Sequence, residues 1–244
     1  MPSPPNSPAN PGAHAPRAAE SSRLSTAYEQ RHAVVYDSWL DPAHCFIHQE
    51  RERCALGLLT REGFTSLADA RILEIGCGTG NWLRDVVHWG AAPENVFGVD
   101  LLADRVATAR RLTAPAVTVT QGDITALDFP DASFDLVIQS TVFSSIIDPE
   151  RRRRTAAEMR RVLKRTGIIV WYDFHVNNPS NQDVRAVRRS EIAPLFPGCR
   201  VHMQRLTLAP PIARALAPIS TFACELLALV PWLRTHTLAA IRPE

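Results

Sequence analysis

Apolar and polar residues follow two alternating patterns along most of the chain. Short apolar runs predict buried strands, and segments with apolar residues at helical spacing separate most of them. The expected strands are 71–75, 95–99, 117–120, 134–139 and 168–174. The expected helices are 81–89, 103–112 and 149–163. This order predicts an α/β fold with a doubly wound, mostly parallel sheet, because parallel strands buried on both faces are continuously apolar.

Two further strand patterns, 200–208 and 235–241, would bring the sheet to seven strands. The segment between them, 209–233, is apolar but is broken by four prolines, which predicts a helical insert before the last strand. Arg214 and Glu225 inside this insert argue against a membrane span. The insert could cover a pocket for an apolar or amphiphilic ligand, or its leucines could simply pack on the sheet edge.

The N-terminal part differs in composition from the rest of the chain. Residues 1–24 are rich in proline and alanine, so we expect a disordered tail. Residues 25–66 have a helical pattern, in which Asp41-Pro42 marks a helix start. They could close over a ligand as a lid or pack on the sheet as an ordinary amphipathic helix. Residues 67–244 then form the main domain.

Charge and cysteine content narrow the range of partners and compartments. A formal net charge of +2 is too small to indicate nucleic acid as the main partner. The five cysteines are odd in number and form no CxxC pair, which favours reduced thiols over a disulfide framework. No basic-then-apolar leader opens the chain, so we expect a cytoplasmic protein. We expect a small-molecule partner and leave a homodimer open.

Residues suited to ligand binding follow three of the expected strands at their carboxyl ends, where α/β sheets bind ligands. Gly76, Gly78 and Gly80 let the backbone approach a ligand closely, and the next helix directs free N–H groups toward it. Asp100 ends the second strand and can accept hydrogen bonds from two ribose hydroxyls. Asp123 follows the third strand and can accept an adenine amino proton. A nucleotide-like ligand is therefore expected.

The glycine spacing distinguishes between such ligands. A dinucleotide fingerprint would need glycine at position 81, where this chain has Asn81. The segment Glu74-Ile75-Gly76-Cys77-Gly78-Thr79-Gly80 instead resembles the first motif of class I S-adenosylmethionine-dependent methyltransferases. Asp100 and Asp123 match the acids that contact ribose and adenine in that family.

Two later segments extend the resemblance. Asp131 to Val137 resembles the entry to the family's fourth strand, and 162–167 resembles the turn before its fifth. Arg165-Thr166 stands there in place of the usual Pro-Gly, a departure that affects a turn and not the cofactor contacts. The resemblance is close over roughly 67–174 and points to the bacterial small-molecule members of the family.

The resemblance implies the Rossmann-like methyltransferase fold with S-adenosylmethionine as the cofactor and no metal. N-terminal extensions in many such enzymes close over the cofactor, which brings Tyr28 and Arg31 into the expected site. The implied cofactor-binding residues are Glu74, Gly76, Cys77, Gly78, Gly80, Asp100, Leu101, Asp123, Ile124, Gln139, Tyr28 and Arg31.

The reaction implied by the resemblance is methyl transfer to a small-molecule acceptor, with O-methylation of a secondary metabolite, quinone or glycan expected first. A hydroxyl acceptor benefits from a general base. His175 lies just beyond the fifth strand and is the first candidate, with Asp173 and Tyr172 as neighbours that face alternate sides. Alternatively, Asp173 and His175 only cap the strand and hydrogen-bond a loop.

Two polar clusters have simpler explanations than a site. His44, His48 and Glu52 are spaced four apart on one helical face, but no fourth metal ligand is evident, and a packed or solvated face explains them. Arg151 to Arg154 could face an anion, or they could form a solvated helix face.

Two alternative functions remain open at this level. The first is a non-catalytic S-adenosylmethionine-binding subunit of a partner enzyme. The second is an NAD-dependent dehydrogenase, which the glycine spacing opposes.

Overall fold

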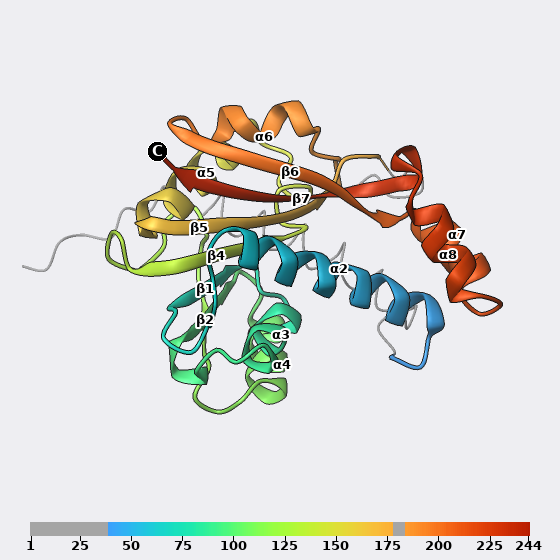
Figure 1. Ribbon diagram of the computed structural model, residues 1–244. Coiled ribbons are helices and arrows are strands. Elements are labelled where there is room, and N and C mark those ends of the chain that lie inside the picture. The colour runs from blue at the N-terminus through green and yellow to red at the C-terminus, as the bar shows by residue number, and fades with distance from the viewer. Residues whose placement is uncertain (1–38, 178–183) are drawn as a thin grey trace, which may run out of the picture. The chain divides into compact units, whose positions relative to one another are not determined.

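A seven-stranded sheet runs through the described residues, 39–177 and 184–244, of the computed structural model (Figure 1). Its strand order is β3-β2-β1-β4-β5-β7-β6. The first five strands are parallel to one another, and β7 is antiparallel to both β5 and β6. The strands are β1 (Ile72–Ile75), β2 (Val96–Asp100), β3 (Thr118–Gln121), β4 (Phe134–Ser140), β5 (Leu163–Phe174), β6 (Cys199–Leu208) and β7 (Arg234–Pro243). The predicted doubly wound, mostly parallel sheet is confirmed.

Helices cover both faces of this sheet (Figure 1). One face packs against α2 (Pro42–Arg61), α3 (Asn81–His88) and α4 (Ala103–Leu112). The other packs against α5 (Pro149–Val162) and α6 (Arg189–Leu195). Short 3-10 turns, η2 (Pro93–Asn95) and η3 (Pro231–Leu233), precede β2 and β7. None of the described helices is both long and apolar enough to cross a membrane.

Side-chain alternation divides the strand residues between the two faces. In β1, Ile72 joins the core beneath α2 and α3, whereas Leu73 joins the core beneath α5. Glu74 follows the same alternation and therefore faces α2 and α3. In β5, Tyr172 faces α2 and α3 and Trp171 faces α5. This alternation decides which polar groups near the strand ends can meet.

The register places the ends of the central strands side by side. Ile75 at the end of β1 pairs with Val99 of β2 and with Gln139 of β4. The loop that follows β1 therefore leaves the sheet at the point where the strand order reverses, the usual position of ligands in such sheets.

The boundaries of the predicted elements agree with the structure to within two residues, except around β5. The expected strand 168–174 begins five residues earlier, at Leu163, and a register shift between Phe134 and Leu136 of β4 accommodates the extra residues. Lys164 reinforces this irregular start through an ion pair with Asp135 at 2.8 Å. The helix α6 had no counterpart in the prediction, because it is short and contains Pro194.

Asp41 caps α2, as the sequence predicted, by accepting a hydrogen bond from the Ala43 N–H at 2.9 Å. The remainder of the expected helical segment, 25–38, lies outside the described residues, as does the proline-rich segment 1–24.

The insert 209–233 is helical, as predicted, and forms α7 (Pro210–Leu216), α8 (Thr221–Ala228) and η3. It leaves and re-enters the sheet at neighbouring points, since Leu208 pairs with Arg234 and the Ala209 N–H donates to the Leu233 carbonyl at 2.8 Å. A separate small core holds it to the first turns of α2 through Ala43 and Phe46.

Candidate cofactor and active site

The loop after β1 has a backbone conformation that requires glycine. Gly76, Gly78 and Gly80 have φ angles of 62°, 54° and 81°, all in the left-handed region. A Cβ at Gly76 would lie 2.5 Å from Cγ2 of Val142, so position 76 also lacks room for a side chain. The loop therefore exposes backbone rather than side chains where it crosses the sheet edge, immediately before the N-terminus of α3.

Asp100 ties this loop to the end of β2. One carboxylate oxygen accepts the Gly78 N–H at 2.8 Å and the other accepts the Leu102 N–H at 2.9 Å. The carboxylate is buried, with 7% of the residue exposed. Each oxygen retains a second lone pair. Asp100 can therefore hold the loop and accept ligand hydroxyls at the same time.

Glu74 lies beneath the loop as a buried acid with an unused acceptor. Its Oε2 has no hydrogen-bond partner within the part of the chain that the structure describes. Burial raises the pKa of Glu74 well above its usual value, although the nearby Arg51 lowers it. A buried carboxylate oxygen without a donor is costly unless a ligand supplies one. An ammonium group is the donor that would best suit this position.

Asp123 lies at the predicted place after β3, but its Oδ1 is already bound within the protein. It accepts hydrogen bonds from the N–H and hydroxyl of Thr125, and Arg151 of α5 pairs with it at 3.0 Å. The neighbouring Ile124 is buried in the core on the α5 side of the sheet. Asp123 is thus held in a fixed orientation, with these contacts all on one oxygen.

The other predicted cofactor residues pack within the loops that follow β1, β2 and β4, or hydrogen-bond to them. Cys77 is buried against Gly98, and burial raises the pKa of its thiol, so it packs as a small apolar residue. Gln139 is fully buried, and its Oε1 accepts the Val142 N–H at 3.2 Å. The Leu101 carbonyl accepts the side-chain N–H of Gln121. Tyr28 and Arg31 lie outside the described residues.

The three predicted catalytic residues make different sets of contacts. Asp173 is buried on the α5 side, where it accepts the N–H groups of Ser144 at 3.0 Å and Phe174 at 2.9 Å. Burial raises the pKa of Asp173 to about 7, while the hydrogen bonds from Ser144 lower it. A carboxyl group that titrates near neutral pH at a strand end is suited to proton transfer, and it also fixes the loop after β4.

Tyr172 faces the opposite side. Its hydroxyl lies 2.9 Å from Oγ1 of Thr207, and its ring stacks on His236 at 4.9 Å between centroids. Burial raises the pKa of Tyr172 to about 12. These contacts keep the phenol neutral and direct it into the core. Tyr172 therefore has a structural role and is poorly placed to transfer a proton.

His175 directly follows β5 and is partly buried. Its Nδ1 is 3.0 Å from Oγ1 of Thr237. Burial lowers the pKa of His175, and the nearby Arg205 and Arg189 lower it further. The imidazole is therefore neutral near pH 7, which is the form that can accept a proton.

An arginine that the sequence did not single out joins α2 to this region. Arg51 pairs with Asp85 of α3 at 2.7 Å, and its guanidinium lies 4.8 Å from the centroid of the Trp82 ring. The positive charge of Arg51 also lowers the pKa of Glu74. Neither the α2 nor the α3 sequence signals this pairing, because the two residues are 34 positions apart on separate helices.

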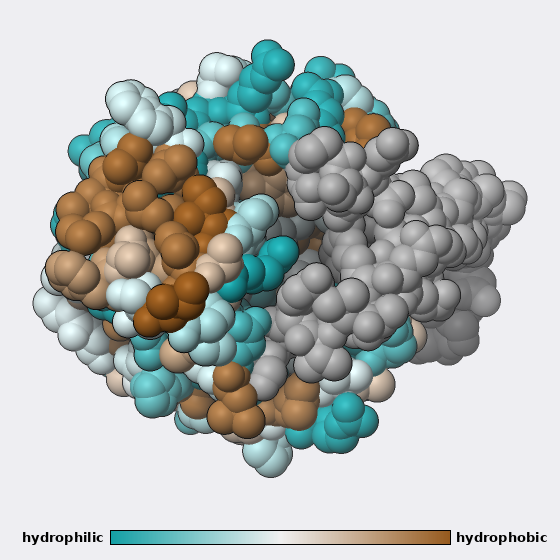
Figure 2. Space-filling view, turned by 90° about the vertical axis from the view of Figure 1, so that its right-hand side faces the viewer, coloured by the Kyte–Doolittle hydropathy of each residue, from teal (hydrophilic) through white to brown (hydrophobic). Residues whose placement is uncertain are grey.

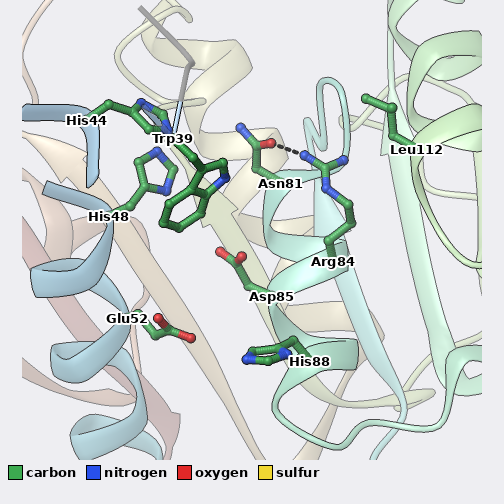
Figure 3. A pocket seen from close by; sticks show the side chains of 9 residues that line it. All are labelled: Trp39, His44, His48, Glu52, Asn81, Arg84, Asp85, His88 and Leu112. Atoms are coloured by element: carbon green, nitrogen blue, oxygen red, sulfur yellow. Dashed lines mark hydrogen bonds between the residues drawn. The ribbon is translucent and has the colours of Figure 1, made fainter. Parts of the chain in front are cut away.

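A cavity of about 510 Å³ opens between α2 and α3 beside the glycine loop (Figure 3). Trp39, His44 and His48 form an aromatic wall on one side, with the two imidazole rings 4.0 Å apart. The Asp85 carboxylate projects from the other side (Figure 3). Burial, followed by Arg51, lowers the pKa of His48 to about 3, so this imidazole is neutral. Among the described residues, no group of His, Cys, Asp and Glu is arranged to hold a metal ion.

The arginine-rich start of α5 is used within the protein more than the sequence suggested. Arg151 pairs with Asp123, and the buried Arg152 donates to the Ile146 carbonyl at 2.7 Å. Arg153 and Arg154 pair with Glu150 on the exposed side of the helix. Two of the four arginines are therefore exposed to solvent, and the other two, Arg151 and Arg152, hold the loops around the site.

The fold and the glycine loop together define a class of protein. The strand order, the left-handed loop after β1 and the carboxylate at the end of β2 are those of class I methyltransferases. Comparison with known families agrees, because residues 72–167 match a family described as a methyltransferase domain. Residues 72–167 are therefore a class I methyltransferase domain, and its cofactor is S-adenosylmethionine.

Individual relatives match only part of their own length. Phosphatidylethanolamine N-methyltransferase of Cereibacter sphaeroides is 35% identical over 105 residues, which cover 41% of this chain and 48% of the relative. The 2-methyl-6-phytyl-1,4-hydroquinone methyltransferase of Synechocystis sp. is 35% identical over 107 residues, which cover 43% of this chain and 32% of the relative. The chain thus spans less than half of either relative.

Solved structures match over a longer range. An S-adenosylmethionine-dependent methyltransferase from Thermotoga maritima covers 93% of this chain and 99% of its own, with a TM-score of 0.58 and 18% identity. At this identity the likeness establishes the fold alone.

Proposed function

We propose that this protein is an enzyme that transfers a methyl group from S-adenosylmethionine to a small-molecule acceptor. The observation that carries the proposal is the orphaned Oε2 of Glu74, buried under a glycine loop whose N–H group is held by Asp100. A buried acceptor without a donor, next to an exposed backbone loop, is a site prepared for a cationic ligand with hydroxyl groups. S-adenosylmethionine has both features.

The residues present fit this cofactor. Glu74 would accept the ammonium of its methionine part, and Asp100 would use its remaining lone pairs for the ribose hydroxyls. Asp123, oriented by Thr125 and Arg151, would accept the adenine amino group, with Ile124 beside the ring. Among the described residues, no side chain caps the N-terminus of α3 at Gly80, which leaves the first N–H groups of this helix for the cofactor.

When bound, S-adenosylmethionine would supply an electrophilic methyl group. The chain itself would position the acceptor, exclude water and remove the acceptor's proton. We propose the neutral imidazole of His175 as the base, oriented by Thr237 through its Nδ1. Asp173, with a pKa of about 7, is the second candidate for the same role.

An acceptor with an apolar part is the class we favour. The two relatives described above are named for a phospholipid and for a phytylated hydroquinone, both of which carry long apolar chains. The apolar insert 209–233 of this chain suits such an acceptor. Within the range of secondary metabolites, quinones and glycans, a quinone-type ring therefore has the most support as the acceptor.

Calorimetry with S-adenosylmethionine tests the cofactor. The wild type should bind it, and Asp100→Asn should bind it at least about tenfold more weakly, because one oxygen becomes an N–H donor facing backbone donors. Asp104→Asn is the matched control, since Asp104 is exposed on α4 near the same edge. Displacement of the cofactor by NAD would contradict the proposal.

Turnover needs its own test. Incubation with isotopically labelled S-adenosylmethionine and pools of quinone, phenol and sugar acceptors should yield labelled products and S-adenosylhomocysteine, detected by mass spectrometry. Tight cofactor binding with no product from any pool would instead support a non-catalytic cofactor-binding subunit. For His175→Ala, an unchanged rate and pH profile would remove His175 as the base.

A further inference from the structure

The insert exposes a continuous row of large apolar side chains. Ile219, Phe222, Leu226, Leu229 and Trp232 are 82%, 66%, 50%, 69% and 81% exposed. They follow helical spacing along α8 and continue into η3. Figure 2 shows apolar side chains gathered on this face of the molecule, the side on which Figure 1 places α7 and α8. We refer to these five residues as the apolar patch.

Folding of the insert does not account for the patch. The residues that α8 buries are small, namely Cys224 and Ala228, which pack on Ala213 and Ala217 of the α7 segment. Of its large apolar residues, Leu227 packs partly against this core, whereas Phe222 and Leu226 point outward. A helix that folds only to cover a core has the opposite arrangement. An exposed apolar patch of this extent on a soluble fold marks an interaction surface.

The patch lies at the edge of the sheet that carries the candidate site. Phe174, at the carboxyl end of β5, pairs with His236 near the start of β7, and β7 begins directly after the insert. The carboxyl ends of the parallel strands and the insert thus share one edge. Whatever binds the patch lies on the side from which an acceptor would enter.

Positive charge accompanies the patch. Residues 199–235 contain four arginines and one glutamate. Two of these arginines lie at the base of the patch, where Arg205 contacts the Pro231 carbonyl at 3.5 Å and Arg234 donates to the Arg205 carbonyl at 3.0 Å. Apolar and aromatic side chains in front of a fringe of arginines are the features of helices that lie in the interface of an anionic membrane.

We propose that the apolar patch docks the protein on the surface of a bilayer that contains anionic phospholipid. Phe222, Leu226 and Trp232 enter the boundary between headgroups and acyl chains, and Arg205 and Arg234 lie at the level of the phosphates. A bilayer suits the patch better than a second copy of the chain, because anionic headgroups complement the four arginines and one glutamate of residues 199–235. The inference rests on the proposed function in one respect: an acceptor with a long apolar chain resides in such a bilayer.

Vesicle flotation with the full chain tests the proposal. The wild type should float with vesicles of phosphatidylcholine and phosphatidylglycerol that contain about a quarter anionic lipid, and binding should weaken with salt and with pure phosphatidylcholine. The double variant Phe222→Ser with Trp232→Ser should lose about tenfold or more in vesicle affinity. Leu56→Ser, an exposed leucine on α2, is the matched control and should bind like the wild type.

Equal vesicle binding by the wild type and the double variant would overturn the proposal. So would a wild-type dimer in analytical ultracentrifugation that the double variant converts to monomer without any vesicle binding, since the patch would then bind a second copy. Calorimetry with S-adenosylmethionine on the same proteins separates this inference from the proposed function. Cofactor binding without vesicle binding defeats only the docking surface, and vesicle binding without cofactor binding defeats only the enzyme.

Discussion

At the scale of single residues, the site depends on positions that accept only one type of residue. Gly76 combines a left-handed φ of 62° with the side chain of Val142 in the space that a Cβ would need. Asp100 must offer two acceptors to two backbone donors. Glu74 must be a buried acid with one oxygen left for the ligand. These residues are therefore the sharpest points at which to test the site.

Gly76→Ala should abolish measurable binding of S-adenosylmethionine and lower the free energy of unfolding by about 2–4 kcal/mol. The strained φ and the overlap with Val142 both displace the loop. Gly90→Ala is the control for strain alone, because Gly90 has a φ of 100° with nothing within 4 Å of its Cβ position. It should lose about 1–2 kcal/mol and retain cofactor binding. Wild-type affinity in Gly76→Ala would show that the loop does not contact the cofactor.

His236 predicts a pH dependence of stability. Burial lowers the pKa of His236 to about 3, from an ordinary value of 6.5, so the folded state favours the neutral ring stacked on Tyr172. Its contribution to stability is present above pH 6.5 and is lost as the pH falls toward 3. His236→Phe keeps the stack and removes the titration. Relative to this variant, the wild type should lose about 1–2 kcal/mol between pH 7.5 and pH 5 in urea denaturation.

Asp173 titrates in a similar range but with the opposite sign. Its raised pKa makes its contribution largest at low pH and removes it as the pH rises from about 4 to about 7. It is present in both proteins, so the difference between wild type and His236→Phe isolates the histidine. A constant difference across this pH range would mean that His236 is not buried as a neutral ring.

The sequence identified residues at strand ends better than residues on helices. Gly76, Gly78 and Asp100 were recognisable because their backbone roles leave a local signature of residue type and spacing. Arg51 and Asp85 were not, because their pairing depends on how α2 lies against α3. The burial of Tyr172 and the contacts of Asp123 with Arg151 likewise arise from packing between distant segments. Such contacts have no pattern in the chain itself.

At the scale of elements, α2 is joined to the cofactor helix by a charged contact. The Arg51 guanidinium contacts both Asp85 and the Trp82 ring, and the residue is 8% exposed. Breaking this ion pair from one side is costly, because the remaining Asp85 carboxylate is partly buried, with 24% of its side chain exposed. The pair therefore joins α2 to α3, and a lid formed by residues 25–66 stays a prediction.

Arg51→Met should lower the free energy of unfolding by about 3 kcal/mol, measured by chemical denaturation, because Asp85 loses its partner. Combining it with Asp85→Asn should recover part of this loss, and the coupling between the two changes measures the pair. The surface pair Arg153–Glu150 provides the control, since its side chains are 65% and 49% exposed. Arg153→Met should change stability by no more than about 0.5 kcal/mol. Similar small effects at both arginines would show that Arg51 does not hold α2.

Most elements were predictable because their apolar residues recur at the spacing of a helix or a strand. The boundaries of α4 agree with the prediction at both ends, and those of β4 agree to within one residue. The early start of β5 at Leu163 was not predictable, because it depends on an irregular pairing with Phe134. The short α6 was missed because a proline inside seven residues removes the helical signal.

At the scale of the whole molecule, the matched family segment and the rest of the chain have different tasks. The match covers 72–167, which contains the glycine loop, Asp100 and Asp123. The residues proposed for proton transfer and membrane docking, such as His175 and Trp232, lie beyond it. Cofactor binding should therefore be a property shared with relatives, and acceptor choice a property of the C-terminal part.

Cofactor binding should stabilise the whole described fold. At a concentration of about 100 times the dissociation constant, S-adenosylmethionine should raise the free energy of unfolding by about 2.7 kcal/mol. NAD at the same concentration is the control and should have no effect. The measurement is chemical denaturation at a fixed protein concentration. Stabilisation by NAD alone would return the chain to the dehydrogenase alternative.

The insert joins the sheet through a narrow base, where Leu208 pairs with Arg234 and Ala209 bonds to Leu233. For protein engineering and for evolution, residues 209–233 are therefore an exchangeable segment. Because the two ends of the segment are neighbours, a short turn or another insert can replace it without changing the strand pairing. Its contacts with Ala43 and Phe46 of α2, with Leu208 and with Arg205 would have to be rebuilt. One exchange at a single hairpin could thus give the same cofactor domain a new acceptor, or release it from a membrane.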